Sequence, residues 1–333
     1  MIAGYHAQAL AQIPGTRLAG VCGRDPGRTA AFADKVGASF STTRIEDLLG
    51  RADVDVVCVT TPSGAHLEPA LAAIAHGKHV VVEKPLEVTV ERADRIIAAA
   101  DRAKVHLCPI FQARFGDGAR TVKAAVEAGR LGTVALASAY VKWYRSAQYY
   151  QSEWKGTQAL DGGGALMNQG IHAVDLLQWF AGMPSEVTGF TTRRVHKAIE
   201  VEDTASAALR FEAGSLGTLE ASTAAWPGWS RRIDLCGEQG SISLEDDRIV
   251  RWDFSTPAAG DDAIRAVKAD TLGSGASAPN AIAIEGHRRQ LQNLVDAIRT
   301  GSPLAIDGRQ ARNAVAIICA LYKSAALSQG VRP

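Results

Sequence analysis

Three polar residues near the middle of the chain have the types and the spacing needed to take a proton from a hydroxyl group. Asn168, His172 and Asp175 follow one another at intervals of four and three residues, so a helix would place them along one face. This helix would begin after residues 162–164, a flexible run of three glycines. An imidazole suits the removal of a hydroxyl proton while a hydride leaves the same carbon. The alternative explanation of His172 is a histidine held in a contact between domains.

A lysine at the end of an apolar run is a second candidate for proton chemistry. Lys84 follows Glu83 and the apolar residues 79–82, and Pro85 would fix the turn that directs the lysine side chain. Open α/β sheets bind ligands at the carboxyl ends of their strands. A lysine partly removed from water has a lowered pKa and can hold or relay the proton of a substrate hydroxyl. The alternative is a surface lysine that merely ends a strand.

The first residues match the end of a dinucleotide-binding turn and the start of the helix that follows it. Ala3 and Gly4 would offer helix-start amides to a pyrophosphate, with Ala3 as the last small residue of a GxGxxG/A pattern. The strand and the first two glycines of that pattern do not occur in this sequence. We therefore expect the natural protein to start upstream; the alternative is a gap repaired by rearrangement or by a partner's strand. An intact mass of 35.1 kDa for the protein from its native source would contradict the upstream start.

The choice of cofactor is expected to depend on the end of the strand at residues 18–23. An acidic residue there favours NAD, whereas an arginine accommodates the 2′-phosphate of NADP. Because Arg24 and Asp25 follow this strand, we expect NAD or NADP with a preference for NADP. Asp25 would otherwise cap the next helix or bind a ribose hydroxyl. Further cofactor-binding residues are expected after the later strands: Thr60, Thr61, Pro62, His66, Glu83 and Lys84.

Aromatic side chains gather just before the glycine run. Their flat faces and polar tips suit a sugar ring, and Arg145 or Lys155 would hold a carboxylate or a phosphate. The alternative is a loop that is anchored by its aromatic residues. The aromatic members are Tyr140, Trp143, Tyr144, Tyr149, Tyr150 and Trp154, of which Tyr150 and Trp154 join Arg145 as candidate substrate ligands.

The elements that must position these residues fall into two predicted domains. Apolar runs alternate with helical periods over residues 1–110, which predicts βαβ units and a Rossmann-type, doubly wound parallel sheet. Short strands joined mostly by short turns follow, and they predict a second α/β domain over residues 111–333 with a large open, mostly antiparallel sheet. A mobile loop over residues 255–279 should then lead to two final helices. The strands are expected at residues 18–23, 54–60, 79–82 and 105–108, and then at 134–142, 186–192, 203–211, 215–223, 232–236 and 241–244.

The composition excludes several other classes of protein. Lys and Arg total 36 against 35 Asp and Glu, so the chain lacks the basic excess of a nucleic-acid or membrane-surface protein. No apolar run is long enough to span a bilayer, and no secretory signal is present in the sequence. The five cysteines are far apart and lack metal-ligand spacing. We therefore expect no metal and a reducing, cytoplasmic location.

Several segments, taken in their order, resemble the Gfo/Idh/MocA family, the group of glucose-fructose oxidoreductase and inositol dehydrogenase. The resemblance covers the chain from its first residue onward. It implies a Rossmann domain followed by an α/β domain, NAD(P)-linked oxidation or reduction of a sugar, inositol or sugar derivative, and homo-dimers or homo-tetramers formed through the second-domain sheet. The segments are TTPSGAH at 60–66, GKHVVVEKP at 77–85, GGGALMNQGIHAVD at 162–175, VEDT at 201–204 and LYKS at 321–324.

The resemblance also implies roles for individual residues. The family commonly has an aspartate four residues before the histidine, and here that position is Asn168, which cannot titrate. We therefore expect His172 to transfer the proton, with Lys84 assisting and Asn168 positioning the substrate. Asp175 would orient His172, or serve in capping or packing. Arg114 corresponds to a family position near the substrate.

Three other functions stay open at this point. An NAD-dependent glycosidase would release a sugar without net change of the cofactor. A regulatory protein of the same fold would bind a dinucleotide and partner chains without turnover, and a remnant would bind no cofactor. The presence of both Lys84 and His172 favours the oxidoreductase.

Overall fold

The computed structural model describes residues 2–266 and 284–333, which form two compact units. The described residues of the first unit are 2–87, 91–112 and 284–311. Those of the second unit are 88–90, 113–266 and 312–333. Residues 284–311 lie far beyond the predicted boundary at residue 110, yet they pack with the first unit.

The strands of the first unit form parallel sheets. β1 (Val21–Cys22) pairs with β2 (Ser41–Thr42), and β3 (Val56–Val59), β4 (His79–Val82) and β5 (Leu107–Pro109) pair in that order. Parallel strands are usually covered on both faces, which explains the continuous apolar run of β4. The predicted Rossmann-type parallel sheet is therefore confirmed. β1 is shorter than its predicted range, and β2 was not predicted because its two residues form no apolar run.

Helices alternate with these strands: α1 (Ile2–Leu10), α2 (Pro26–Val36), α3 (Ile45–Leu49), α4 (Leu67–Ala75) and α5 (Val90–Ala103). The first helix, α1, shares a core with α9 (Glu285–Thr300), which lies far along the chain. Full burial of one leucine contributes about 1.5–3 kcal/mol, so the apolar stripe of α9 explains why this helix returns to the first unit. The shared core consists of Ala9, Ile13, Val81, Cys108, Ile110, Leu291 and Leu294.

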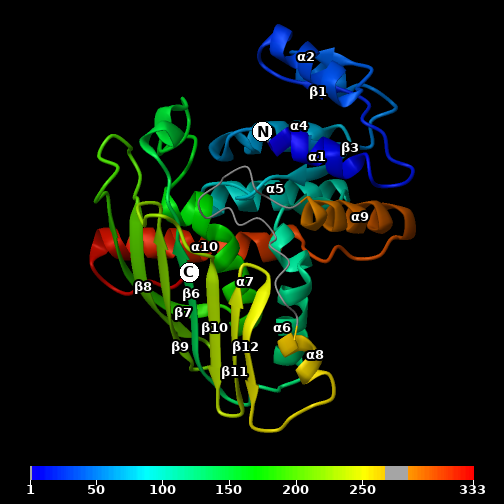
Figure 1. The fold of residues 1–333 in the computed structure, drawn as a ribbon. Helices are drawn as coiled ribbons and strands as arrows, with labels where there is room; N and C mark the ends of the chain where they lie inside the picture. The colour runs from blue at the N-terminus through cyan, green and yellow to red at the C-terminus, as the bar shows by residue number, and fades with distance from the viewer. Residues whose placement is uncertain (1, 267–283) are drawn as a thin grey trace. The chain divides into compact units, whose positions relative to one another are not determined.

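A mixed sheet of seven strands organises the described part of the second unit (Figure 1). Its order is β12-β11-β10-β6-β9-β8-β7, and the neighbours are antiparallel except for the parallel pair β6 and β9. The predicted open, mostly antiparallel sheet is confirmed, while β12 was missed because charged residues interrupt its apolar pattern. The strands are β6 (Val134–Lys142), β7 (Pro184–Thr192), β8 (Thr204–Phe211), β9 (Leu216–Ser222), β10 (Arg232–Gly237), β11 (Gly240–Glu245) and β12 (Arg248–Phe254).

One face of this sheet is covered and the other is open. Buried and exposed residues alternate along β8, as expected for a strand with one face on a core. Helix α7 (Ile171–Ala181) packs on the covered face against β6 and β10. The open face carries the exposed apolar side chains of Leu136, Phe190 and Leu216.

The remaining described helices include the second of the two predicted final helices. α10 (Gly308–Leu327) follows α9, which confirms that pair, and α6 (Asp117–Glu127) precedes β6. α8 (Asp261–Ala266) lies within the predicted mobile loop, whose residues 267–279 fall outside the described residues. Among the described helices, none combines the length and the apolar character needed to cross a membrane.

Candidate active site

Lys84 lies at the carboxyl end of β4, where the sequence predicts a ligand-binding residue. It is the one partly exposed residue in the fully described run 80–87, whose other members are buried. The neighbouring Glu83 is buried, and its Oε2 accepts a hydrogen bond from the backbone N–H of Lys84 at 3.1 Å. The strand end therefore presents a lysine while its other side chains are held inside the unit.

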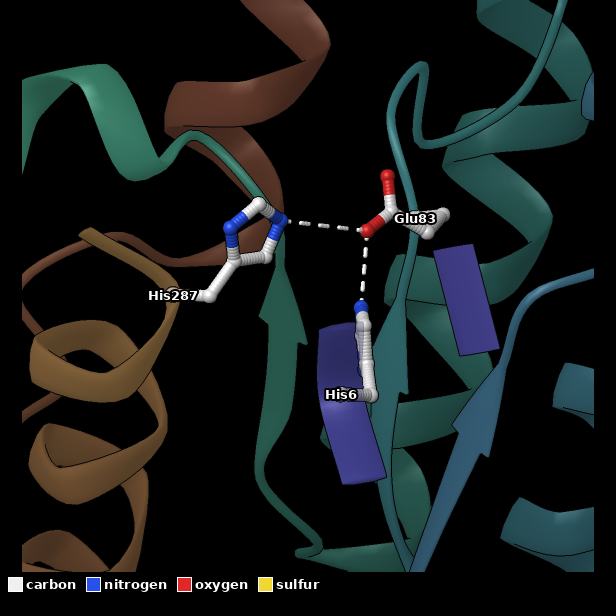
Figure 2. A group of neighbouring side chains, drawn as sticks. All are labelled: His6, Glu83 and His287. Carbon is white, nitrogen blue, oxygen red and sulfur yellow. Dashed lines mark hydrogen bonds and ion pairs between the residues drawn. The ribbon is translucent and has the colours of Figure 1, made fainter. Parts of the chain in front are cut away.

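His6 and His287 both contact the same carboxylate oxygen of Glu83 (Figure 2). The Nε2 atom of His6, on α1, lies 2.7 Å from Glu83 Oε1, and the Nε2 atom of His287, on α9, lies 3.6 Å from it. All three side chains are buried. We did not predict either histidine, because neither belongs to a local motif and only the folded unit brings them to Glu83.

The charges of this group follow from its hydrogen bonds. Although burial acts to raise it, the pKa of Glu83 is held well below its usual value by His287 and His6. Burial acts to lower the pKa of His6, but Cys58 and Glu83 raise that pKa to about 10. Glu83 and His6 therefore form a buried ion pair, which anchors the end of β4 to α1.

The same three side chains have the donor types of a zinc site. Their ligand atoms lie within 4.8 Å of one another. Ligands around a tetrahedral Zn²⁺ with bonds of about 2.0 Å stay roughly 3.3 Å apart, however. The 2.7 Å between His6 Nε2 and Glu83 Oε1 is instead a hydrogen-bond distance. We therefore describe the group as a hydrogen-bonded ion pair.

The residues predicted to bind the cofactor diphosphate and ribose lie at the ends of other elements. Ala3 and Gly4 are in the first turn of α1, and among the described residues no atom lies within 4 Å of a Cβ built on Gly4. Arg24 is exposed just beyond β1. Asp25 caps α2, because its Oδ1 accepts a hydrogen bond from the N–H of Arg28 at 2.7 Å. Of the two alternatives considered for Asp25, the structure thus shows helix capping.

His66 connects the loops that follow β3 and β4. Its Nδ1 lies 2.8 Å from the carbonyl oxygen of Pro85, and its Nε2 lies 3.0 Å from that of Thr61. Burial lowers the pKa of His66, which favours the neutral ring. Thr60, Thr61 and Pro62 form the loop after β3, and binding of the cofactor by these residues and by His66 stays a prediction.

In the second unit, the predicted helical stripe begins on a π-helix. Ala165–Gly170 form this π-helix, and α7 follows from Ile171. Asn168 therefore lies on the π-helix, whereas His172 and Asp175 lie on α7. Asn168 is also the one partly exposed residue in the fully described run 161–178. π-Helical turns widen a helix and often occur at functional sites.

Buried hydrogen bonds explain why the chain adopts this conformation after the glycine run. Glu202 accepts hydrogen bonds from the N–H groups of Gly164 and Leu166, both at 2.9 Å, and from the hydroxyl of Tyr322 at 3.0 Å. A Cβ at Gly164 would collide with the backbone of Glu202, so this position requires glycine. The segments around Glu202 and Tyr322 thus hold the π-helix in place.

Asp175 forms a buried ion pair with Arg114. The guanidinium donates from Nε to Oδ2 at 2.8 Å and from Nη2 to Oδ1 at 2.6 Å, and both side chains are almost fully buried. The Arg114 guanidinium also lies over the ring of Trp179, 5.2 Å from its centroid. Asp175 thus takes the packing role considered above. Binding of substrate by Arg114 stays a prediction, and it would have to compete with this pair.

The aromatic group of the second unit surrounds two cations. Arg145 is buried, and its Cζ lies 5.0 Å from the ring centroid of Trp143 and 5.4 Å from that of Tyr149. Lys155 Nζ lies 3.7 Å from the ring centroid of Tyr149 and 5.9 Å from that of Trp154. Burial lowers the pKa of Arg145. Cations over aromatic faces are a suitable environment for an acidic sugar derivative.

Tyr150 joins this group to the end of β9. Its hydroxyl donates to Thr223 Oγ1 at 2.8 Å, and its ring centroid lies 4.9 Å from that of His196. Tyr149 packs edge-on against Tyr150. The aromatic residues therefore anchor the loop, and binding of substrate by Arg145, Tyr150 and Trp154 stays a prediction.

The fold is that of a dinucleotide-dependent oxidoreductase, and comparison with protein families agrees. Residues 1–111 match the oxidoreductase family with an NAD-binding Rossmann fold, and residues 119–243 match the GFO/IDH/MocA C-terminal domain. The chain belongs to the Gfo/Idh/MocA family of oxidoreductases. The predicted family, fold class and enzyme class are confirmed.

Individual relatives are sugar and inositol enzymes. The chain is 30% identical over 319 residues to inositol 2-dehydrogenase 1 of Saccharopolyspora erythraea, covering 92% of this chain and 86% of that one. It is 32% identical over 188 residues to 1,5-anhydro-D-fructose reductase of Ensifer adhaerens, and it spans only 56% of that relative. The WlbA dehydrogenase of Bordetella pertussis, solved with NADH and UDP-GlcNAcA, superposes with a TM-score of 0.90 at 31% identity, covering 100% of this chain and 95% of that one.

Proposed function

We propose that this protein transfers a hydride between NAD(H) or NADP(H) and a CH–OH carbon of a sugar derivative that carries an acidic group. The observation that carries the proposal is the buried Arg145 among aromatic rings, in the same unit as Asn168 and His172. A desolvated guanidinium binds a carboxylate or phosphate through charge-assisted hydrogen bonds. The similarity to the WlbA dehydrogenase, solved with UDP-GlcNAcA, supports an acidic substrate.

Each of the candidate site residues has a defined task in this proposal. The nicotinamide, when bound, supplies or accepts the hydride. The helix-start amides at Ala3 and Gly4, in the first turn of α1, hold the pyrophosphate. His172 removes the hydroxyl proton during oxidation and returns it during reduction, and Lys84 assists this proton transfer. Asn168 positions the substrate.

A cofactor titration followed by a substrate panel tests the function. We expect NADH to bind with a saturable change in fluorescence, and we expect UDP-GlcNAcA and glucuronate to react faster than UDP-GlcNAc and glucose. Lys84→Met should lower kcat by about 10²-fold or more without weakening NADH binding. The exposed Lys35→Met is the matched control. Failure to bind either dinucleotide would overturn the oxidoreductase, and release of sugar from a glycoside without cofactor change would indicate a glycosidase.

The preference for NADP is a separate proposal that rests on Arg24. This arginine is exposed beyond β1, and Asp25 is used as the cap of α2. An arginine at this strand end accommodates the 2′-phosphate. Arg24→Ala should therefore weaken NADPH binding by about tenfold and leave NADH binding nearly unchanged. Equal losses for both cofactors, measured by the same titration, would contradict this assignment.

The assembly and the location of the protein are further parts of the proposal. Exposed Leu136, Phe190 and Leu216 on the open face of the sheet support association of two or four copies through that face. Light scattering of the purified protein tests this, since a mass near 35.1 kDa would exclude it. The wide spacing of the five cysteines along the sequence supports a reducing, cytoplasmic location.

A further inference from the structure

A buried carboxylate lies directly behind the partly exposed Asn168. Asp161 is 1% exposed, and its Oδ1 accepts a hydrogen bond from Asn168 Nδ2 at 2.5 Å. This distance is short for an N–H···O bond, as expected when the acceptor is charged. The other oxygen, Oδ2, accepts from the N–H of Gly156 at 2.8 Å. Both oxygens of the buried carboxylate therefore accept hydrogen bonds.

This pairing decides which way the Asn168 amide faces. The two ends of an asparagine amide are nearly equal in shape, so only their partners determine which end is the donor. An ionised carboxylate only accepts hydrogen bonds. The NH₂ group of Asn168 therefore turns toward the buried Asp161, and the carbonyl oxygen Oδ1 turns the other way.

The charge of Asp161 also acts on the neighbouring aromatic group. Burial first, and then the charge of Asp161, raise the pKa of Tyr149 to about 12. Burial is also the main cause that raises the pKa of Tyr150. Both phenols consequently stay neutral at physiological pH.

We propose that Asp161 is a positioning residue, which fixes Asn168 so that its Oδ1 accepts a hydrogen bond from a substrate hydroxyl. The inference rests on the proposed function. The pair sets a buried carboxylate behind a partly exposed amide. It keeps a carboxylate nearby but presents a neutral amide to the substrate, so an acidic substrate is not repelled and proton transfer is left to His172.

Three variants test the pair without any substrate. Asn168→Asp places two carboxylates within hydrogen-bond distance, where they share one proton and the pKa of one of them rises above its unfolded value. Stability that depends on a raised pKa is present at low pH and is lost as the pH rises through that pKa. The Tm of Asn168→Asp should therefore fall by about 5 °C relative to the wild type between about pH 4 and pH 8.

Two further variants and a control test the cause of this fall in Tm. The double variant Asp161→Asn with Asn168→Asp, called the charge-swapped protein, has a single carboxylate and should regain the wild-type dependence of Tm on pH. Asp161→Asn alone has none, and it should show no new dependence. Asn293→Asp is the matched control, because Asn293 Oδ1 accepts from the N–H of Ala305 and an aspartate retains that acceptor. A wild-type profile in Asn168→Asp would overturn the pairing.

A kinetic comparison then separates positioning from a purely structural role. The kinetics of each variant are compared on two pairs of an acidic and a neutral substrate, glucuronate with glucose and UDP-GlcNAcA with UDP-GlcNAc. Asp161→Asn should lower kcat about tenfold on the acidic substrate, because the amide loses its fixed orientation. Asn168→Asp and the charge-swapped protein should both lower the ratio of kcat/KM for acidic over neutral substrate by about tenfold or more. A normal kcat in Asp161→Asn, or a normal ratio in the swapped protein, would overturn positioning.

The outcomes distinguish this inference from the proposed function. A wild-type protein that binds no dinucleotide or turns over none of these sugars overturns the proposed function and, with it, the role assigned to the pair. The dependence of Tm on pH still decides whether Asp161 and Asn168 form the pair. Normal turnover by the wild type together with unchanged variants would instead overturn the inference alone.

Discussion

Replacing His172 by asparagine is expected to lower kcat by about 10³-fold while the Kd for NADH changes by less than about threefold. General acid–base catalysis by a positioned side chain typically contributes 10²–10⁴-fold. In this protein we expect His172 to carry the proton transfer with Lys84 assisting, because Asn168 carries an amide that cannot exchange a proton with the substrate. Asparagine preserves polarity and approximate size, so the buried start of α7 should keep its fold.

Steady-state kinetics and a fluorescence titration with NADH measure the two halves of this prediction separately. His76→Asn provides the control, since this histidine is exposed at the end of α4. Near-normal turnover in His172→Asn would remove His172 from catalysis. A parallel loss of NADH binding would indicate a role in folding or cofactor binding instead.

The second large effect is expected on stability, from Arg114→Met. This change leaves the carboxylate of Asp175 buried without its guanidinium partner. Removing one member of a buried ion pair typically costs about 3–5 kcal/mol of the free energy of unfolding. Chemical denaturation monitored by fluorescence measures the loss. Arg210→Met is the matched control, because Arg210 and Glu186 form an exposed pair on the same unit, where the expected change is about 0–1 kcal/mol.

The dependence on pH tests the cause of this loss. Burial raises the pKa of Asp175 even in the presence of Arg114, and without the arginine its pKa rises further. A group with a raised pKa in the folded state stabilises at low pH and loses that contribution as the pH rises. The loss in Arg114→Met should therefore be smaller at about pH 5 than at about pH 8. Arg114→Met combined with Asp175→Leu should recover much of the stability, and no recovery would contradict the ion-pair explanation.

The proposed arrangement links substrate chemistry to the sequence at position 168. A carboxylate at this position would meet an acidic sugar with like charge, whereas the amide of Asn168 does not. Arg145 and Lys155 supply positive charge in the same unit, and Asp161 keeps its negative charge buried. Selectivity for acidic substrates is therefore expected to follow from two features, the cations among the aromatic rings and the neutral amide.

Much of the fold could be predicted from local patterns. The bounds of β4 and β6 agree with their predicted ranges, because continuous apolar or alternating runs define strands wherever burial is regular. Lys84 at a strand end and His172 on a helix were located for the same reason. β2 and β12 escaped prediction, since β2 has only two residues and charged residues interrupt the apolar pattern of β12.

The amino-acid sequence by itself determined the family, the two kinds of sheet, the place of Lys84 at a strand end and the place of His172 on a helix. Only the tertiary structure decided what surrounds these residues. It brought His6 and His287 to Glu83, assigned Arg114 to Asp175, and placed the buried Asp161 behind Asn168. The physical reason is that a buried charge must find its partner wherever the chain brings one, and no local periodicity records that choice.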